Sequence, residues 1–174
     1  MANTFVKIAS VTVGSGGAAN IDFTSIPQTY TDLVVVYSMR GTNAGTTGYV
    51  NINFNNSTSG YSNTSVFGTS TVVYSYRYTT LSYLWGGLYQ GNGATANTFG
   101  NGQIYIPNYA GSNAKSISID QVSENNASTA DAAFALLNAG LWNNTAAITS
   151  VKLTNDTSNW AQYSTATLYG IKKD

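Results

Sequence analysis

Short apolar segments that alternate with polar residues recur along the whole chain, and most of them end in clusters of Gly, Asn or Ser. In the segment Tyr49–Phe54, for example, alternation places Val50, Ile52 and Phe54 on one face and two asparagines on the other. A period of two, bounded by turn residues, is typical of β-strands, because successive side chains of a strand point to opposite faces. The pattern therefore predicts an all-β protein.

Two segments depart from plain alternation in informative ways. The apolar phase of Phe5–Val13 slips near Ala9, which predicts a bulged or bent strand. The run Leu33–Met39 is nearly continuously apolar, which predicts a central strand covered on both faces, or on one face with a partner subunit on the other.

Two further segments are harder to assign. Ala132–Leu141 contains good helix formers, yet it lies among predicted strands and runs into Gly140, so a strand is favoured over a helix. The segment Ser57–Thr71 is polar and contains glycine, which predicts a long loop anchored by Val66 and Phe67.

About eight to twelve short antiparallel strands, without a convincing helix, are expected to form a β-sandwich, a barrel or a jelly roll. A chain of 174 residues falls in the size range of one domain. We therefore expect residues 1–174 to form a single jelly-roll-like β-sandwich domain.

Composition narrows the possible functions. The chain has no Cys and no His, which excludes disulfides, thiolate or imidazole metal sites and Ser-His-Asp triads. Charged residues make up only 8% of the chain and its formal net charge is zero, so nucleic-acid binding is not expected. A surface this poor in charge suits a protein held within an assembly.

The sequence shows neither a secretory signal pattern at its start nor an apolar run of about 20 residues for a membrane helix. We therefore expect a soluble protein that is made in the cytoplasm of its host cell and does not bind membranes.

Paired carboxylates could in principle serve a glycosidase or hold calcium. Most of the internal acids stand beside turn residues, where side-chain oxygens commonly stabilise turns. The internal acids are Asp22, Asp32, Asp120, Glu124, Asp131 and Asp156. No motif surrounds them, so we predict no catalytic, metal-binding or cofactor-binding residue, and no enzymatic activity.

One cluster of aromatic residues stands out. It comprises Tyr74, Tyr76, Tyr78, Tyr83, Trp85 and Tyr89. Such side chains could form a stacking platform for sugar rings, or they could pack in the core or at a subunit interface, where Tyr and Trp are enriched. The sequence leaves these alternatives open and favours the core or the interface.

Four segments carry a resemblance to a known group of proteins. They are Ser25–Leu33, Ile52–Asn55, Thr145–Ser150 and Ala166–Lys172. Here the chain resembles small structural proteins of bacteriophage virions. The resemblance implies a jelly-roll-like capsid decoration or cement protein without a cofactor. It would act on the outer surface of the head as a homotrimer that bridges subunits of the major capsid protein.

Similar sequences also occur among phage tail and fibre components. The alternative function is therefore a tail or fibre receptor-binding module that recognises host-surface glycan through the aromatic cluster. The two hypotheses differ in location on the virion and in the chemistry of the partner.

Overall fold

The computed structural model describes residues 4–69, 71–127 and 133–172. Every regular element in this part of the chain is a β-strand. The twelve strands are β1 (Phe5–Thr12), β2 (Asn20–Phe23), β3 (Asp32–Met39), β4 (Thr47–Phe54), β5 (Tyr61–Gly68), β6 (Val73–Leu81), β7 (Leu84–Gln90), β8 (Gly100–Ile106), β9 (Lys115–Ser123), β10 (Phe134–Trp142), β11 (Val151–Asn155) and β12 (Thr165–Ile171).

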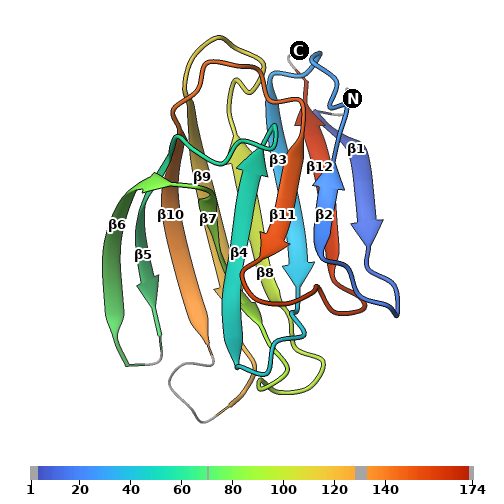
Figure 1. Cartoon of the computed structure of the whole chain (residues 1–174), viewed down its shortest axis with the longest axis vertical. Coiled ribbons are helices and arrows are strands. Elements are labelled where there is room, and N and C mark those ends of the chain that lie inside the picture. The colour runs from blue at the N-terminus through green and yellow to red at the C-terminus, as the bar shows by residue number, and fades with distance from the viewer. Residues whose placement is uncertain (1–3, 70, 128–132, 173–174) are drawn as a thin grey trace.

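The strands form two antiparallel sheets that pack face to face (Figure 1). The large sheet has eight strands in the order β1-β12-β3-β8-β9-β10-β5-β6, and the small sheet has four in the order β2-β11-β4-β7. This arrangement confirms the all-β sandwich that the alternating pattern predicts.

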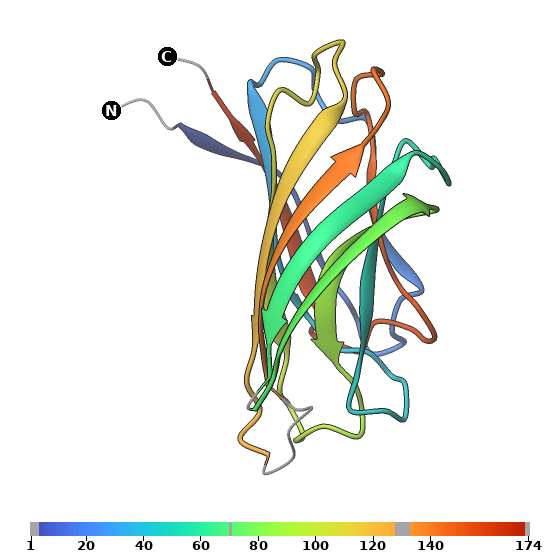
Figure 2. The ribbon, with the colours of Figure 1, turned by 90° about the vertical axis from the view of Figure 1, so that its left-hand side faces the viewer.

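The chain passes repeatedly between the sheets. Strands β1 and β3 belong to the large sheet, whereas β2 and β4 belong to the small one. Two hairpins, β5–β6 and β9–β10, depart from this alternation, because both strands of each join the large sheet. They extend the large sheet past the small one, and β5 and β6 curve across the side of the molecule (Figure 2).

The principal core lies between the two sheets. Alternate residues of β3, including Leu33, Val35 and Met39, are fully buried. They belong to the same hydrophobic cluster as Ile52 and Phe54 of β4. Full burial of each such side chain contributes about 1.5–3 kcal/mol relative to exposure.

Strand β7 is the edge of the small sheet, yet all seven of its residues are buried. The extended large sheet covers it, and side chains from that sheet pair with its free backbone groups. Asn138 Nδ2 donates to the Trp85 carbonyl oxygen at 2.5 Å, and the Tyr37 hydroxyl donates to the Gly86 carbonyl oxygen at 2.5 Å. An edge covered in this way offers no template for pairing with another chain.

Several predictions about individual strands are confirmed. The pairing of β1 with β12 shifts register between Lys7 and Ala9, where the apolar phase slips. Strand β3 is central, between β12 and β8, and its outer face is covered only in part, since Val34 is buried and Val36 is 43% exposed. The ambiguous segment forms strand β10 from Phe134; its first residue, Ala132, lies outside the described residues.

The predicted loop Ser57–Thr71 is wrong, because residues Tyr61–Gly68 form strand β5, paired with β10 and β6. The inward positions of β5 are Tyr61, Asn63, Ser65 and Phe67. Two polar residues at inward positions hide the apolar alternation that marks the other strands.

Candidate functional site

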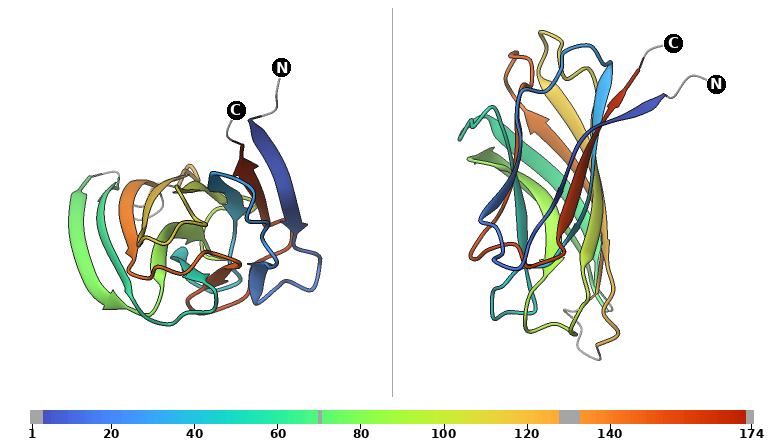
Figure 3. Two further views of the ribbon diagram at one scale, coloured as in Figure 1. Left: turned by 90° about the horizontal axis from the view of Figure 1, so that it is seen from above. Right: turned by 90° about the vertical axis from the view of Figure 1, so that its right-hand side faces the viewer.

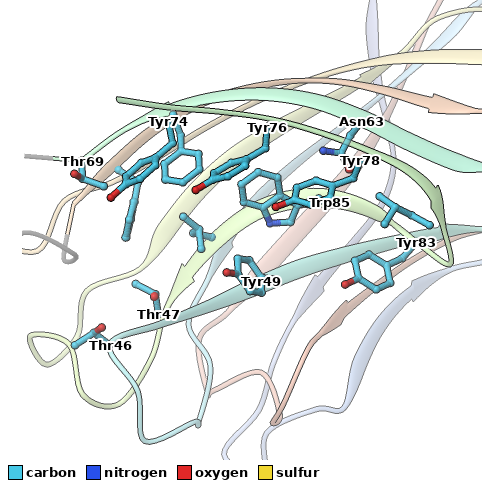
Figure 4. Close-up of a pocket in the computed structure, with 14 residues that line it drawn as sticks. Thr46, Thr47, Tyr49, Asn63, Thr69, Tyr74, Tyr76, Tyr78, Tyr83 and Trp85 are labelled. Carbon is cyan, nitrogen blue, oxygen red and sulfur yellow. The ribbon is translucent and has the colours of Figure 1, made fainter. Parts of the chain in front are cut away.

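An open groove of about 580 Å³ lies between the β5–β6 hairpin and the small sheet (Figure 4). This volume is within the range of about 300–1,000 Å³ that small-molecule sites occupy. The lining residues are Thr46, Thr47, Tyr49, Asn63, Phe67, Thr69, Tyr74, Tyr76, Tyr78, Leu81, Tyr83, Trp85, Leu88 and Phe134.

A row of three tyrosines forms one wall. Tyr74, Tyr76 and Tyr78 alternate along β6 and therefore point to the same side of the strand (Figure 4). The ring centroids of Tyr74 and Tyr76 are 6.0 Å apart, those of Tyr76 and Tyr78 are 5.9 Å apart, and both pairs are stacked. Tyr76 is 39% exposed and Tyr78 is 47% exposed, so this wall faces solvent.

The floor is a second hydrophobic cluster, distinct from the principal core. It contains Trp85, Leu88, Phe134 and Leu136, with Phe67 packed against them. The ring of Phe67 meets Trp85 edge to face at 5.9 Å. Packing of this kind fixes the floor and supports the tyrosine wall from below.

Strand β4 supplies the opposite wall through Thr47 and Tyr49, with Tyr83 at one end (Figure 4). Tyr49 packs edge to face on Trp85 at 5.8 Å. Partial burial, followed by the charge of Asp156, raises the pKa of Tyr49 above its ordinary value. Its side chain therefore stays a neutral phenol at physiological pH and can donate a hydrogen bond.

Asn63 is the one amide among the described lining residues, and sequence reasoning missed it, as it missed the three threonines of the lining. Asn63 is buried, and both atoms of its amide lack a hydrogen-bond partner within the described residues. The same holds for Trp85 Nε1, also in the lining, and for Oγ of neighbouring Ser65. A buried polar group left unpaired costs about 1–3 kcal/mol. A signal was present in the sequence, because Asn63 and Ser65 stand at the same spacing of two as Tyr61 and Phe67 and therefore share their face of the strand.

Of the six aromatic residues singled out in the sequence, the structure brings five into the groove lining and places Tyr89 elsewhere. Tyr89 lies in the principal core, edge to face with Trp160 at 5.2 Å, and its hydroxyl donates to Asp156 Oδ1 at 2.9 Å. Burial raises the pKa of Tyr89 to about 12.

A bulge in β7 explains this separation. Tyr49 pairs with Leu88 and Asn51 with Trp85, so β7 has three steps where β4 has two. Gly87 lies between them with a φ of +109°, a conformation that side chains disfavour. The strand therefore changes phase after Trp85, and Leu88 rather than Tyr89 faces the groove.

The acidic residues form no composite site. Within the described ranges, no group of three or more His, Cys, Asp or Glu residues could hold a metal ion. Asp32 accepts hydrogen bonds from the Asn108 backbone N–H and the Tyr105 hydroxyl, both at 2.8 Å. Asp156 bonds to β4 through the Tyr49 backbone N–H at 3.2 Å. Asp131 lies outside the described residues.

The fold and the groove together define a β-sandwich protein with a solvent-open aromatic site. The chain matches no protein-family model, no curated protein and no solved structure. Over the residues that the structure describes, no helix has the length and apolar character needed to cross a membrane.

Proposed function

We propose that this chain is a non-enzymatic virion protein that recognises host-surface glycan, and that the aromatic groove is its binding site. The observation that carries the proposal is the row of solvent-exposed tyrosines on β6 facing Tyr49 across an apolar floor.

Sugar rings suit this groove because they combine apolar faces with a rim of hydroxyl groups. Aromatic rings bury the apolar faces, and phenol and threonine hydroxyls bond to the rim. The groove offers both kinds of group, with Thr46 and Thr47 beside Tyr49 and opposite the tyrosine row (Figure 4).

The virion setting rests on the resemblance of four chain segments to phage structural proteins, and the strand order agrees with it. Strands β1-β12-β3-β8 and β2-β11-β4-β7 form two four-stranded rows between which the chain repeatedly crosses. We assign this eight-strand frame to a jelly roll, with β5–β6 and β9–β10 as inserted hairpins. The groove then lies between an inserted hairpin and the frame.

Two observations support a binding role over catalysis. The groove lining contains no carboxylate among the described residues, so a two-carboxylate glycosidase mechanism has no acid there. The chain also contains no His and no Cys, the residues that most often serve as general base or nucleophile beside the carboxylates.

A glycan array probed with the purified protein tests the proposal. We expect selective binding that weakens about tenfold or more in Tyr76→Ala, because a stacking ring is lost from the exposed wall. Tyr163→Ala is the matched control, since Tyr163 is 68% exposed and lies outside the groove. Absence of binding to every glycan, or equal binding by Tyr76→Ala, would contradict the proposal.

Capsid decoration is the second candidate function, and the outer face of the large sheet favours it. Leu137 and Val66 are opposite each other on β10 and β5 and are 55% and 44% exposed, and Val122 on β9 is 57% exposed. Exposed apolar side chains on a sheet face suit contact with another protein, here the major capsid protein.

Mixing the protein with phage heads that lack it tests this second function. Ordered density at threefold positions in cryo-electron micrographs, absent with Leu137→Lys, is the expected result for a trimeric decoration protein. Bare heads would remove the decoration role and leave the glycan-binding role standing.

A further inference from the structure

The groove lining carries no charged side chain among the described residues. Arg77 lies between Tyr76 and Tyr78 on β6, so alternation directs its side chain to the opposite face of the strand. Its register partner, Thr64, is exposed on that outer face. The groove therefore contains aromatic rings, hydroxyls and an amide, without a cation to pair with an acidic sugar.

A negative charge lies close to the β4 wall. Asp156 Oδ1 accepts hydrogen bonds from the Tyr49 backbone N–H at 3.2 Å and from the Tyr89 hydroxyl at 2.9 Å. These contacts hold the carboxylate directly behind the β4 wall. An anionic ligand would meet this charge without a compensating Lys or Arg in the lining, and the repulsion disfavours its binding.

The unpartnered amide of Asn63 is a second, independent observation. Asn63 is only 3% exposed, and neither Nδ2 nor Oδ1 has a hydrogen-bond partner within the described part of the chain. An amide presents a donor and an acceptor side by side, which matches two neighbouring hydroxyls of a sugar ring. Trp85 Nε1 adds a third unpartnered atom, a donor, to the same lining.

We propose that the groove selects neutral oligosaccharides over acidic ones, and that Asn63 is the residue that hydrogen-bonds the sugar hydroxyls. This inference rests on the proposed glycan-binding function. Tyr78 is the register partner of Asn63 and is 47% exposed. The proposal requires its ring to rotate so that the amide meets a ligand that stacks on Tyr76. Binding then satisfies polar atoms that are unpaired in the free protein.

The first experiment compares probes of known charge. Affinity electrophoresis in gels that contain laminarin or mannan, as neutral polysaccharides, is compared with gels that contain alginate or hyaluronan. We expect retardation by at least one neutral polysaccharide and none by the acidic ones. The retardation should change little between about 0.01 and about 1 M salt, because no charge pair is screened.

The second experiment uses Asn63→Leu, which keeps the approximate size of the side chain and removes its amide. We expect affinity for the neutral polysaccharide to fall about tenfold or more. The melting temperature should rise by about 2–4 °C or stay unchanged, because no hydrogen bond is lost and an unpaired amide is removed. A merely structural role for Asn63 would instead lower the melting temperature.

The outcomes separate this inference from the function on which it rests. Retardation by alginate or hyaluronan that is lost in Tyr76→Ala would leave glycan binding in place and overturn the neutral selectivity. Neutral binding unchanged in Asn63→Leu would overturn the role of Asn63. Absence of retardation by all four polysaccharides, together with a silent glycan array, would overturn both the function and the inference.

Discussion

The side-chain amide of Asn138 donates a hydrogen bond to the backbone carbonyl oxygen of Trp85 at 2.5 Å. The contact is buried and joins β10, in one of the two hairpins that extend the large sheet, to β7 at the edge of the small sheet. It holds the aromatic floor of the groove against the large sheet, and it replaces the strand partner that the β7 edge lacks at this residue.

Replacement of Asn138 by Leu should therefore destabilise the protein. The Trp85 carbonyl oxygen would lose its donor inside an apolar site, and we expect the free energy of unfolding to fall by about 1–3 kcal/mol. Urea denaturation measures the change. Asn63→Leu is the matched control, since its amide has no hydrogen-bond partner among the described residues and its removal should not destabilise. An equal loss of unfolding free energy in the two variants would contradict the stabilising role of the hydrogen bond between Asn138 and Trp85.

Gly140→Ala should also be destabilising. A Cβ atom at Gly140 would lie 2.4 Å from Leu84 Cδ1, so the buried Leu84 side chain would have to shift. Overpacking of this kind costs about 1–3 kcal/mol, which thermal unfolding would detect as a lower melting temperature. At Gly68 nothing lies within 4 Å of an added Cβ, so Gly68→Ala should leave stability nearly unchanged.

Alkaline pH should weaken the fold through its buried tyrosines. Burial raises the pKa of Tyr89 from 10.0 to about 12 and raises that of Tyr37 in the same direction. Between pH 10 and about 12 the unfolded chain loses the Tyr89 proton while the folded chain keeps it, so stability is full below pH 10 and falls as pH rises.

The expected slope from one such group is about 1.4 kcal/mol per pH unit. Tyr89→Phe should remove this contribution and leave that of Tyr37. Urea denaturation at stepped pH values measures the free energy of unfolding of the wild type and of the variant as a function of pH. The same decline in wild type and variant above pH 10 would show that Tyr89 does not titrate as its burial requires.

Lys115 is fully buried, and its ammonium group fixes the connection between β8 and β9. Its Nζ donates to the carbonyl oxygens of Gly111 at 2.7 Å and Asn113 at 2.5 Å. Lys115→Met keeps the length of the side chain but leaves both carbonyls without this donor, and we expect a loss of about 1–3 kcal/mol by denaturant unfolding.

Lys152→Met is the control for this substitution. Lys152 is partly exposed, and its Nζ lies 3.9 Å from an oxygen of Asp22, a distance typical of weak surface pairs. We expect the free energy of unfolding of the Lys152→Met variant to differ from that of the wild type by less than about 1 kcal/mol. A larger loss at Lys152 than at Lys115 would contradict the role given to the buried lysine.

Most strands could be predicted from the sequence because the pleat of a strand leaves a period of two in the residues. This holds for β9, where Ile117 and Ile119 are buried between exposed polar residues. It fails for β5, where Asn63 and Ser65 take inward positions. The failure coincides with the candidate site, because Asn63 lines the groove.

The aromatic wall of the groove was visible in the sequence, whereas its remaining parts were not. Tyr74, Tyr76 and Tyr78 are close together in the chain, so their shared face follows from alternation. Tyr49 and Phe134 reach the groove only through the pairing of β4 with β7 and the packing of β10 on β7. Such long-range contacts leave no local pattern.

The two edge strands of the large sheet, β1 and β6, lie on opposite sides of the molecule. Phe5 pairs with Ile171 where β1 meets β12 at one edge, and β6 with its tyrosine row forms the other edge (Figure 3). A tether attached near either chain end therefore leaves the groove on the far side of the molecule. A protein displayed on a carrier by these ends would present its aromatic groove away from the carrier.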